Sequence, residues 1–278
     1  MVLAHISDVH FGRIADPRIV GALIDDVHAA DVAVAVVGGD LTQRSRPSEW
    51  EAAKAFLALL PGEVIVIAGN HDVYPWWFPI RRVLTPLVRY RMAVNSPLDV
   101  TLRLQDVRLI GLNSAHGLTD YGGKFNVAQA ELAEEFLGSG DITHYRILLV
   151  HHQIVRSEYT RRGDVAKRSE RVLAAAVNAG VDVVLDGHIH RSGVGLLCTG
   201  GRTVVRSSAG TATSDRGRFR DRGRNLYSLV RLDSGVEVEE RVFDRDSGHF
   251  RCERLSAFRR MDGGWCIDTG AEPGVSSN

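Results

Sequence analysis

Five short stretches of this sequence contain residues that commonly bind metal ions, and each directly follows an apolar run. They are Asp8-Val9-His10, Gly38-Gly39-Asp40, Gly69-Asn70-His71-Asp72, His151-His152 and Gly187-His188-Ile189-His190. In an open α/β sheet, ligands bind beyond the carboxyl ends of parallel strands, so we expect these stretches to converge on one site. Asp, His and Asn without Cys suit Mn, Fe or Zn, and they disfavour copper(I) and iron–sulfur clusters.

The spacing within the stretches is consistent with shared sites. Residues two apart point the same way in extended chain, so Asp8 and His10 can face one ion, as can His188 and His190. Glycines at 39, 69 and 187 are expected to let the backbone turn sharply as it leaves a strand.

The preceding apolar runs predict buried strands, because they are continuous rather than alternating. These strands are expected at 2–6, 32–37, 64–68, 108–112, 146–150 and 181–185. Amphipathic segments predict helices at 16–30, 47–60, 127–137 and 169–179. Asp16 is the expected N-cap of the first helix, with Pro17 as its first residue. The alternation indicates a central sheet covered by helices on both faces.

The pattern changes after Arg191. Short alternating segments at 194–198, 203–207, 226–232 and 236–243 predict antiparallel strands within 193–260 that complete the same domain. We therefore expect one domain over residues 1–269. Residues 270–278 are small and polar and predict a flexible tail.

The composition limits the class of protein. The chain has 278 residues with 34 Lys+Arg and 34 Asp+Glu, and this neutral balance argues against a dedicated nucleic-acid binder. Three cysteines, Cys198, Cys252 and Cys266, cannot form a closed disulfide set and fit a reducing compartment. No run reaches the roughly 20 apolar residues of a membrane span, and no leader pattern follows Met1. We expect a cytoplasmic protein.

The five stretches, in this order, resemble the calcineurin-like metallophosphoesterase superfamily over residues 1–192. The motifs ISDVHFG, GGDLT and AGNHD and the double histidine are similar to the bacterial branch that resembles class III cyclic-nucleotide phosphodiesterases. The resemblance implies a four-layer α/β/β/α sandwich of two mixed sheets flanked by helices, the metallo-dependent phosphatase fold. One departure is Gln153, where such proteins often have Pro after the double histidine.

The resemblance also implies two metal sites that share a carboxylate. One ion would be held by Asp8, His10 and His190, the other by Asn70, His151 and His188, and Asp40 would bridge them. The pair would be divalent or trivalent transition-metal ions: Mn, Fe or Zn. His71 would face the phosphate and protonate the leaving oxygen, and Asp72 would orient its ring. Two ions about 3.5–4 Å apart clamp both oxygens of an in-line displacement and ionise a bridging water near neutral pH.

Several residues have two interpretations. His152 is the alternative to His151 as a ligand. Arg13 is either a phosphate contact or a surface residue, and Asn113 either lines the pocket or forms a turn. The aromatic run of Trp76, Trp77 and Phe78 is either a substrate wall or core packing. The run from Arg216 to Arg224, with arginine at every second position, either tracks a polyanion or is a solvated loop.

These features predict a binuclear metal-dependent phosphoric ester hydrolase that cleaves a phosphodiester by attack of a metal-bridging hydroxide. A small cyclic or nucleotide-type substrate is favoured, with nucleic acid disfavoured as a partner. The alternatives are a pyrophosphohydrolase acting on a UDP-linked lipid precursor, a nuclease and a metal-free scaffold. The scaffold is the least favoured because no ligand of the set is missing. The sequence predicts neither the native metal pair nor the oligomeric state.

Overall fold

A computed structural model describes residues 1–94, 97–139 and 145–269. Within these residues the helices are α1 (Ile19–Ala29), α2 (Pro47–Leu57), α3 (Pro79–Leu84), α4 (Val88–Val94), α5 (Val127–Gly138) and α6 (Ser169–Asn178), with 3-10 turns η1 (Asn70–Asp72) and η2 (Phe219–Asp221). The first seven strands are β1 (Val2–Ile6), β2 (Val34–Val37), β3 (Glu63–Val66), β4 (Val100–Arg103), β5 (Val107–Leu112), β6 (Tyr145–Val150) and β7 (Val183–Asp186). The remaining strands are β8 (Gly193–Thr199), β9 (Arg202–Ser208), β10 (Leu226–Leu232), β11 (Val236–Asp244), β12 (His249–Met261) and β13 (Gly264–Ile267).

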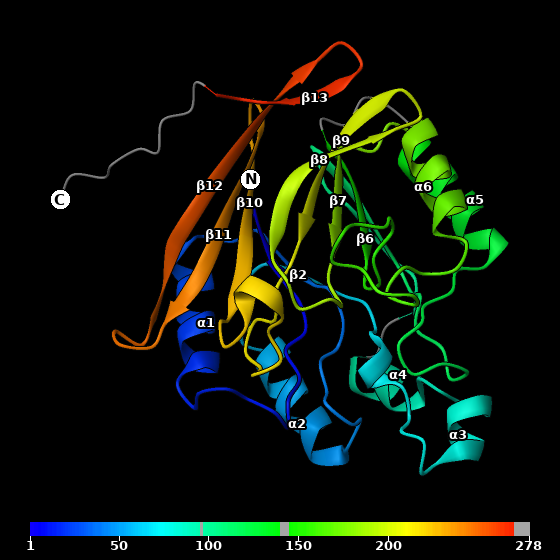
Figure 1. Cartoon of the computed structure of the whole chain (residues 1–278), viewed down its shortest axis with the longest axis vertical. Coiled ribbons are helices and arrows are strands. Elements are labelled where there is room, and N and C mark those ends of the chain that lie inside the picture. Colours follow the sequence, from blue (N-terminus) through cyan, green and yellow to red (C-terminus); the bar gives the residue numbers. More distant parts are fainter. Residues whose placement is uncertain (95–96, 140–144, 270–278) are drawn as a thin grey trace.

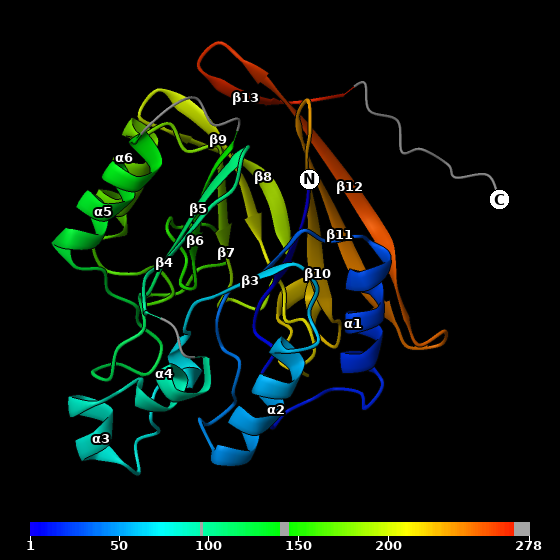
Figure 2. The same ribbon diagram turned by 180° about the vertical axis from the view of Figure 1, so that it is seen from behind.

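The strands form one hydrogen-bonded path that folds into two layers. Its order is β3-β2-β1-β10-β11-β12-β13-β9-β7-β6-β5-β4, and β8 pairs with β9 off this path. The half from β3 to β12 and the half from β9 to β4 are joined through β13, whose link to β9 is the single pair Gly264–Thr203. Figures 1 and 2 show the two halves side by side, with α1 and α2 by one and α5 and α6 by the other.

Three apolar cores account for this layering. The central core joins Leu3 and Val36 of one half-sheet to Ile147 and Leu185 of the other. An outer core places α1 and α2 against β1 and β2, and a second places α5 and α6 against β5 and β6. The strands β1, β2, β5, β6 and β7 are buried on both faces, and they are therefore continuous apolar runs. The expected four-layer α/β/β/α arrangement is confirmed.

Two local predictions differ from the structure. The first helix begins at Ile19 rather than at Asp16, since the Asp16 carboxylate accepts from the backbone N–H of Arg18 and closes a turn before the helix. Strand β9 pairs antiparallel with β8 but parallel with β7, so the segment after residue 193 is not wholly antiparallel. Residues 270–278, predicted to be a flexible tail, lie outside the described residues.

The predicted elements otherwise lie close to their expected positions, and β12, β13, β4, α3 and α4 are additional. Among the described residues, no helix has the length and apolar character needed to cross a membrane.

Candidate metal centre

The five metal-competent stretches meet where the parallel strands end. Backbone hydrogen bonds tie them together: the Asp8 N–H donates to Gly39 O at 3.0 Å, and the His10 N–H donates to Asp40 O at 2.9 Å. These residues lie just beyond β1 and β2, so the two loops run as a pair over the edge of the sheet. The convergence expected from the topology is present.

The backbone at these residues is not extended. Nine non-glycine residues in the described parts of the chain have positive φ, and five belong to the predicted ligand set: Asp8, His10, Asp40, His188 and His190. The prediction that two-residue alternation in extended chain aligns the side chains is therefore wrong. Residues in the left-handed region direct these side chains instead. This conformation costs non-glycine residues free energy, so it persists where the surrounding structure holds it, and such places are often functional sites.

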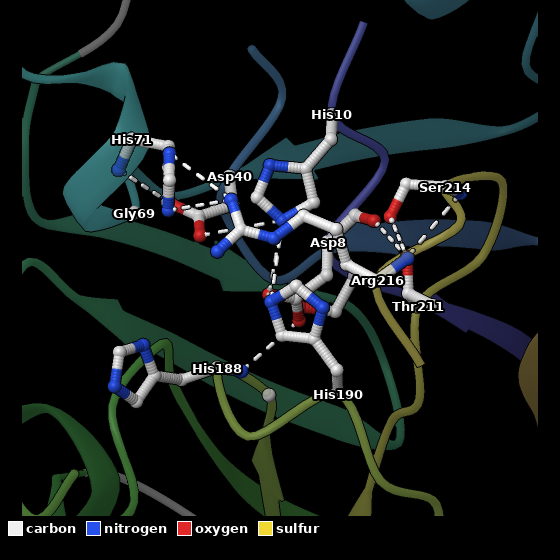
Figure 3. Close-up of polar contacts among 12 residues, drawn as sticks. Asp8, His10, Asp40, Gly69, His71, His188, His190, Thr211, Ser214 and Arg216 are labelled. Carbon is white, nitrogen blue, oxygen red and sulfur yellow. Dashed lines mark hydrogen bonds and ion pairs between the residues drawn. The ribbon is translucent and has the colours of Figure 1, made fainter. Parts of the chain in front are cut away.

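Four buried side chains form the first cluster: Asp8, His10, Asp40 and His190. Asp8 Oδ1 lies 3.7 Å from His10 Nε2 and 3.2 Å from His190 Nε2. The two Nε2 atoms are 3.3 Å apart. Figure 3 shows the rings of His10 and His190 next to each other beside Asp8. Two carboxylates and two imidazoles facing one point make a ligand set for a transition metal.

The Asp40 carboxylate faces two groups of histidines. Its Oδ2 lies 3.6 Å from His10 Nε2, and its Oδ1 lies 3.5 Å from His151 Nε2. His151 Nε2 is also 3.2 Å from Asn70 Oδ1. The Asn70 amide group donates to the carbonyl of Asp120, which turns its oxygen toward His151. Asp40 thus has one oxygen on each side of the centre.

His188 lies beside His151 but does not point toward the first cluster. Its ring centroid is 5.2 Å from that of His151 and 4.5 Å from that of His152, and the three histidines form the second cluster. Its Nε2 lies 3.6 Å from Oδ1 of Asp164, a carboxylate that the sequence analysis did not single out. Figure 3 shows the His188 ring directed away from Asp8.

His151 and His152 differ in what they face. His152 Nδ1 lies 2.7 Å from Ser114 Oγ, whereas its Nε2 has no hydrogen-bond partner. His151 is the residue directed at Asp40 and Asn70. We keep His151 as the proposed ligand.

Backbone carbonyls fix three of the imidazole rings. Nδ1 of His10 lies 3.3 Å from Thr42 O, Nδ1 of His151 lies 2.7 Å from Gly38 O, and Nδ1 of His71 lies 2.9 Å from Gln43 O. A carbonyl can only accept, so each Nδ1 is the donor in these hydrogen bonds and each Nε2 is the ring nitrogen left for another partner. Such partners orient metal-binding histidines and raise their basicity.

Asp72 does not orient the His71 ring as the resemblance implied. Its carboxylate accepts from the backbone N–H groups of Gly69 and Thr42, each at 2.9 Å, and from the Thr42 hydroxyl at 3.0 Å. The carbonyl of Gln43 holds the His71 ring instead. Asp72 fixes the backbone on both sides of the site, so its effect on His71 is indirect.

The charges of the centre shift several pKa values. Burial raises the pKa of Asp40, but the nearby His151 and His71 outweigh it and hold that pKa well below its ordinary value. Burial lowers the pKa of His151, but the charge and hydrogen bond of Asp40 raise it to about 9. The pKa of His71 is lowered to about 3, mainly by burial. Burial and the charge of Asp40 raise the pKa of Asp72 to about 6.

Two glycines are required for different reasons. Gly39 has φ +96°, and a Cβ there would lie 2.7 Å from His151 Nδ1. Gly69 has an ordinary negative φ, so the expected sharp turn is not its role. A Cβ at Gly69 would lie 2.1 Å from Asp40 Oδ1, so only glycine leaves room for the shared carboxylate.

The side chains fit a pair of metal ions. Buried polar atoms are rarely left without partners. Here Asp8 Oδ1, Asp40 Oδ2, both ring nitrogens of His188 and His190 Nδ1 have no hydrogen bond. Asp8 Oδ1 and Asp40 Oδ2 both face the first cluster, where a cation would satisfy them.

Arg216, which the sequence analysis named only as the start of the arginine run, belongs to the centre. Its Nη1 lies 2.8 Å from His71 Nε2 and 3.2 Å from Gln43 Oε1. The loop before it is anchored to the first metal stretch, because the hydroxyls of Thr211 and Thr213 donate to the carbonyls of Asp8 and Val9 at 2.6 and 2.5 Å. Figure 3 shows Arg216 extending from this loop toward His71. The Thr and Ser residues before the arginine run were the available signal.

Of the other residues that the sequence analysis singled out, some line a cavity next to the centre. A cavity of about 120 Å³ opens beside the centre and includes Arg13, Asn70, His71, Trp76 and Arg216 in its lining. Trp76, Trp77 and Phe78 are exposed rather than core residues.

Two other polar residues support loops. Asn113 forms a local turn through its amide and Ala115. Gln153 donates to Asp186 Oδ1 and to Gly187 O, and so braces the loop before His188 at the position where the resemblance suggested Pro.

Comparison with known proteins identifies the class. The family model for calcineurin-like phosphoesterases matches residues 1–192, and the chain belongs to this family. Its members form a class of metal-dependent phosphoric ester hydrolases.

Individual relatives cover different parts of the chain. It is 33% identical over 97 residues to the glycerophosphodiester phosphodiesterase GpdQ of Enterobacter lignolyticus (strain SCF1), a match that spans 31% of this chain and 34% of that protein. A purple acid phosphatase from yellow lupin (Lupinus luteus) superposes with a TM-score of 0.70 at 14% identity, covering 92% of this chain and 53% of that one. A dimetal phosphatase from Danio rerio gives 0.62 at 13% identity, covering 87% and 95%. The two structures share the fold with this chain.

Proposed function

We propose that this protein is a binuclear metal-dependent phosphodiesterase whose single catalytic domain comprises residues 1–269. The observation that carries the proposal is the Asp40 carboxylate, with one oxygen toward His10 and the other toward His151. A carboxylate in this position is suited to bridge two ions. The first ion would be held by Asp8, His10, Asp40 and His190, and the second by Asp40, Asn70, His151 and His188.

Bound ions of this kind polarise phosphoryl oxygens and lower the pKa of coordinated water. The chain supplies the remaining positive charge. Arg216 lines the cavity with its guanidinium beside His71, and it forms no ion pair with a carboxylate of the described residues. Its planar N–H groups match the non-bridging oxygens of a phosphodiester. Arg216 therefore binds the phosphoryl group beside His71.

His71 donates the proton to the leaving oxygen. In the substrate-free protein its pKa of about 3 makes the ring neutral, and Nε2 accepts from Arg216. A phosphodiester anion placed between the two side chains raises the His71 pKa, because a nearby negative charge favours the imidazolium. Protonation is then coupled to substrate binding, and Nε2 is the atom that carries the proton.

A small cyclic or nucleotide-type phosphodiester is the favoured substrate. The partial likeness to a glycerophosphodiester phosphodiesterase supports diester chemistry, and the modest cavity supports a small group at the phosphate. The second candidate is a pyrophosphohydrolase acting on a UDP-linked lipid precursor. It is favoured by Trp76 and Tyr121, which are exposed and line the cavity.

A substrate panel with metal analysis tests the proposal. Chromogenic monoesters and diesters, cyclic nucleotides and UDP-linked sugars are assayed with added Mn²⁺, and metal content is measured by mass spectrometry. We expect two ions per chain and the highest kcat/KM on a diester. Full turnover by thoroughly stripped protein would exclude metal-dependent hydrolysis, and a clear preference for the pyrophosphate would select the second candidate.

A further inference from the structure

Exposed apolar side chains are concentrated at one corner of the molecule. Seven of the sixteen exposed large apolar residues in the described chain lie within residues 76–92. We call six of them, on α3 and the loop before it, the aromatic corner: Trp76, Trp77, Phe78, Ile80, Val83 and Leu84. Trp77 is 55% exposed, and Ile80 and Leu84 are each 73% exposed. Clustered exposure of this kind marks an interaction surface, whereas scattered apolar residues are ordinary.

The aromatic corner is held in place by Arg82. This buried guanidinium donates to the carbonyls of Tyr74 and Thr119 at 2.5 and 2.6 Å. It also lies 4.1 Å from the centre of the Trp76 ring, whose indole N–H donates to Asp120. Arg82 therefore fixes α3 to the neighbouring loop and packs against Trp76. The exposed side chains of the aromatic corner therefore project from a segment that these contacts hold in place.

The same segment is positively charged in a chain with no net charge. Residues 74–94 contain four arginines and no acidic residue, whereas the whole chain has 34 of each sign. Arg81 and Arg91 are exposed. The Arg89 guanidinium lies 4.5 Å from the Tyr74 ring centre and 5.6 Å from that of Phe78. Exposed tryptophan beside arginine is typical of segments that rest in the interface of an anionic bilayer.

The corner is next to the candidate site. Trp76 belongs both to the aromatic corner and to the lining of the cavity that contains His71 and Arg216. Figures 1 and 2 place α3 at the extremity of the molecule, away from α5 and α6. A flat surface could therefore contact α3 without meeting the rest of the fold.

We propose that the aromatic corner docks the protein on an anionic lipid bilayer. Trp77, Ile80 and Leu84 enter the headgroup–acyl boundary, and Arg81 and Arg91 meet the lipid phosphates. The cavity mouth is then held at the height of the lipid headgroups. This docking does not depend on the proposed phosphodiesterase chemistry, and its test uses binding alone.

Vesicle co-sedimentation tests the docking. The full chain is mixed with phosphatidylcholine vesicles with and without phosphatidylglycerol, at low and high salt. We expect binding to the anionic vesicles that weakens with salt, and a blue shift of tryptophan emission that Trp77→Ser reduces. Arg81→Gln and Arg91→Gln should each weaken binding about fivefold, the equivalent of about 1 kcal/mol per basic residue near an anionic surface.

Two matched double variants distinguish docking through the aromatic corner from nonspecific hydrophobic adsorption to vesicles. Ile80→Ser/Leu84→Ser should lower the vesicle partition coefficient by about tenfold or more, because binding scales with the apolar area that enters the interface. Leu59→Ser/Ile267→Ser removes two equally large exposed side chains from distant positions and should bind like wild type. Both pairs should retain metal content and melting temperature.

Three results would overturn the docking. Equal loss of binding in both pairs, or binding insensitive to phosphatidylglycerol, would exclude a built anionic-lipid surface. A concentration-dependent dimer that Ile80→Ser/Leu84→Ser dissociates, without vesicle binding, would assign the corner to a second copy of the chain instead.

Discussion

The two metal-competent clusters differ in the number of carboxylates that they contain and in how closely their ligand atoms converge. The first combines two carboxylates with two imidazoles, and its ligand atoms already lie 3.2–3.7 Å apart. The second consists of three histidines with no carboxylate among them, and His188 is turned toward Asp164. A site with more negative charge and prearranged ligands binds its ion more tightly, so we expect the two proposed positions to differ in affinity.

The largest expected effect on activity comes from removing the Asp40 carboxylate, which the two proposed metal positions share. Asp40→Ala should lower occupancy of both positions and reduce hydrolysis of every substrate to the background rate, since each side loses a carboxylate oxygen. Metal content by mass spectrometry and rates on two esters check this. Glu51→Ala, which removes an exposed carboxylate paired with Lys54 on α2, is the control. Loss of only one ion in Asp40→Ala would mean that Asp40 is not shared.

A residue outside both clusters should separate chemistry from metal binding. His71→Ala should slow an alkyl ester by about 10²–10⁴, the range of general acid catalysis, and an activated aryl ester much less. Both ions should remain, because His71 is not a proposed ligand. Rates on the two esters and metal content are measured together. An equal decrease on both esters would assign His71 to charge stabilisation rather than proton transfer.

The strands beneath the clusters differ in their response to acid. β1 buries His5 completely, and burial lowers the pKa of His5 to about 4 from 6.5. β6 buries Ile147, Leu148, Leu149 and Val150 in the corresponding layer. Because the folded pKa is lower than the unfolded one, the unfolded chain takes up the proton first. Stability is therefore complete above pH 6.5 and falls toward pH 4, by roughly 3 kcal/mol for this group.

His5→Gln should remove that dependence. Denaturant unfolding from pH 7.5 to 4 should show the difference in unfolding free energy between variant and wild type moving in favour of the variant by roughly 3 kcal/mol. His28→Gln, which changes an exposed histidine, should show little movement. Parallel pH profiles for wild type and His5→Gln would show that His5 is not the titrating group.

The smallest effect is the order in which the ions leave. Under graded chelation the ion of the second cluster should dissociate first, with affinities that differ by about tenfold or more, the scale on which even outer partners change metal affinity. His190→Ala should reverse the order. Metal content along a chelator titration checks this. Simultaneous loss of both ions in wild type would remove the distinction between the clusters.

Much of the fold could be predicted because it follows from local patterns. Continuous apolar runs placed β1, β2, β5 and β6 to within a residue or two, and the polar residues that follow them located the centre. β12 was not predicted, because most of its residues are exposed and its sequence contains five charged residues between His249 and Met261. A strand with a solvated, charged face has no continuous apolar run to reveal it.

The details of the centre depend on contacts that no local pattern contains. Arg216 reaches His71 across 145 positions of sequence, and Asp164 reaches His188 through a loop between β6 and α6. The positive φ values of Asp8 and His10 were missed for another reason. Extended chain was the simplest geometry that could align the two side chains, and the turn that does so is set by the neighbouring Asp40 loop.

The left-handed backbone at five proposed ligands also limits which substitutions these positions accept. β-Branched residues tolerate that conformation poorly, whereas Gly, Asn and Asp adopt it with little penalty. A descendant that no longer needed metal would still have to accommodate the turns at Asp8, His10, Asp40, His188 and His190. Its replacements should be Gly, Asn or Asp rather than Val, Ile or Thr. The residue types at those five positions would thus still reflect the backbone conformation of the former metal site.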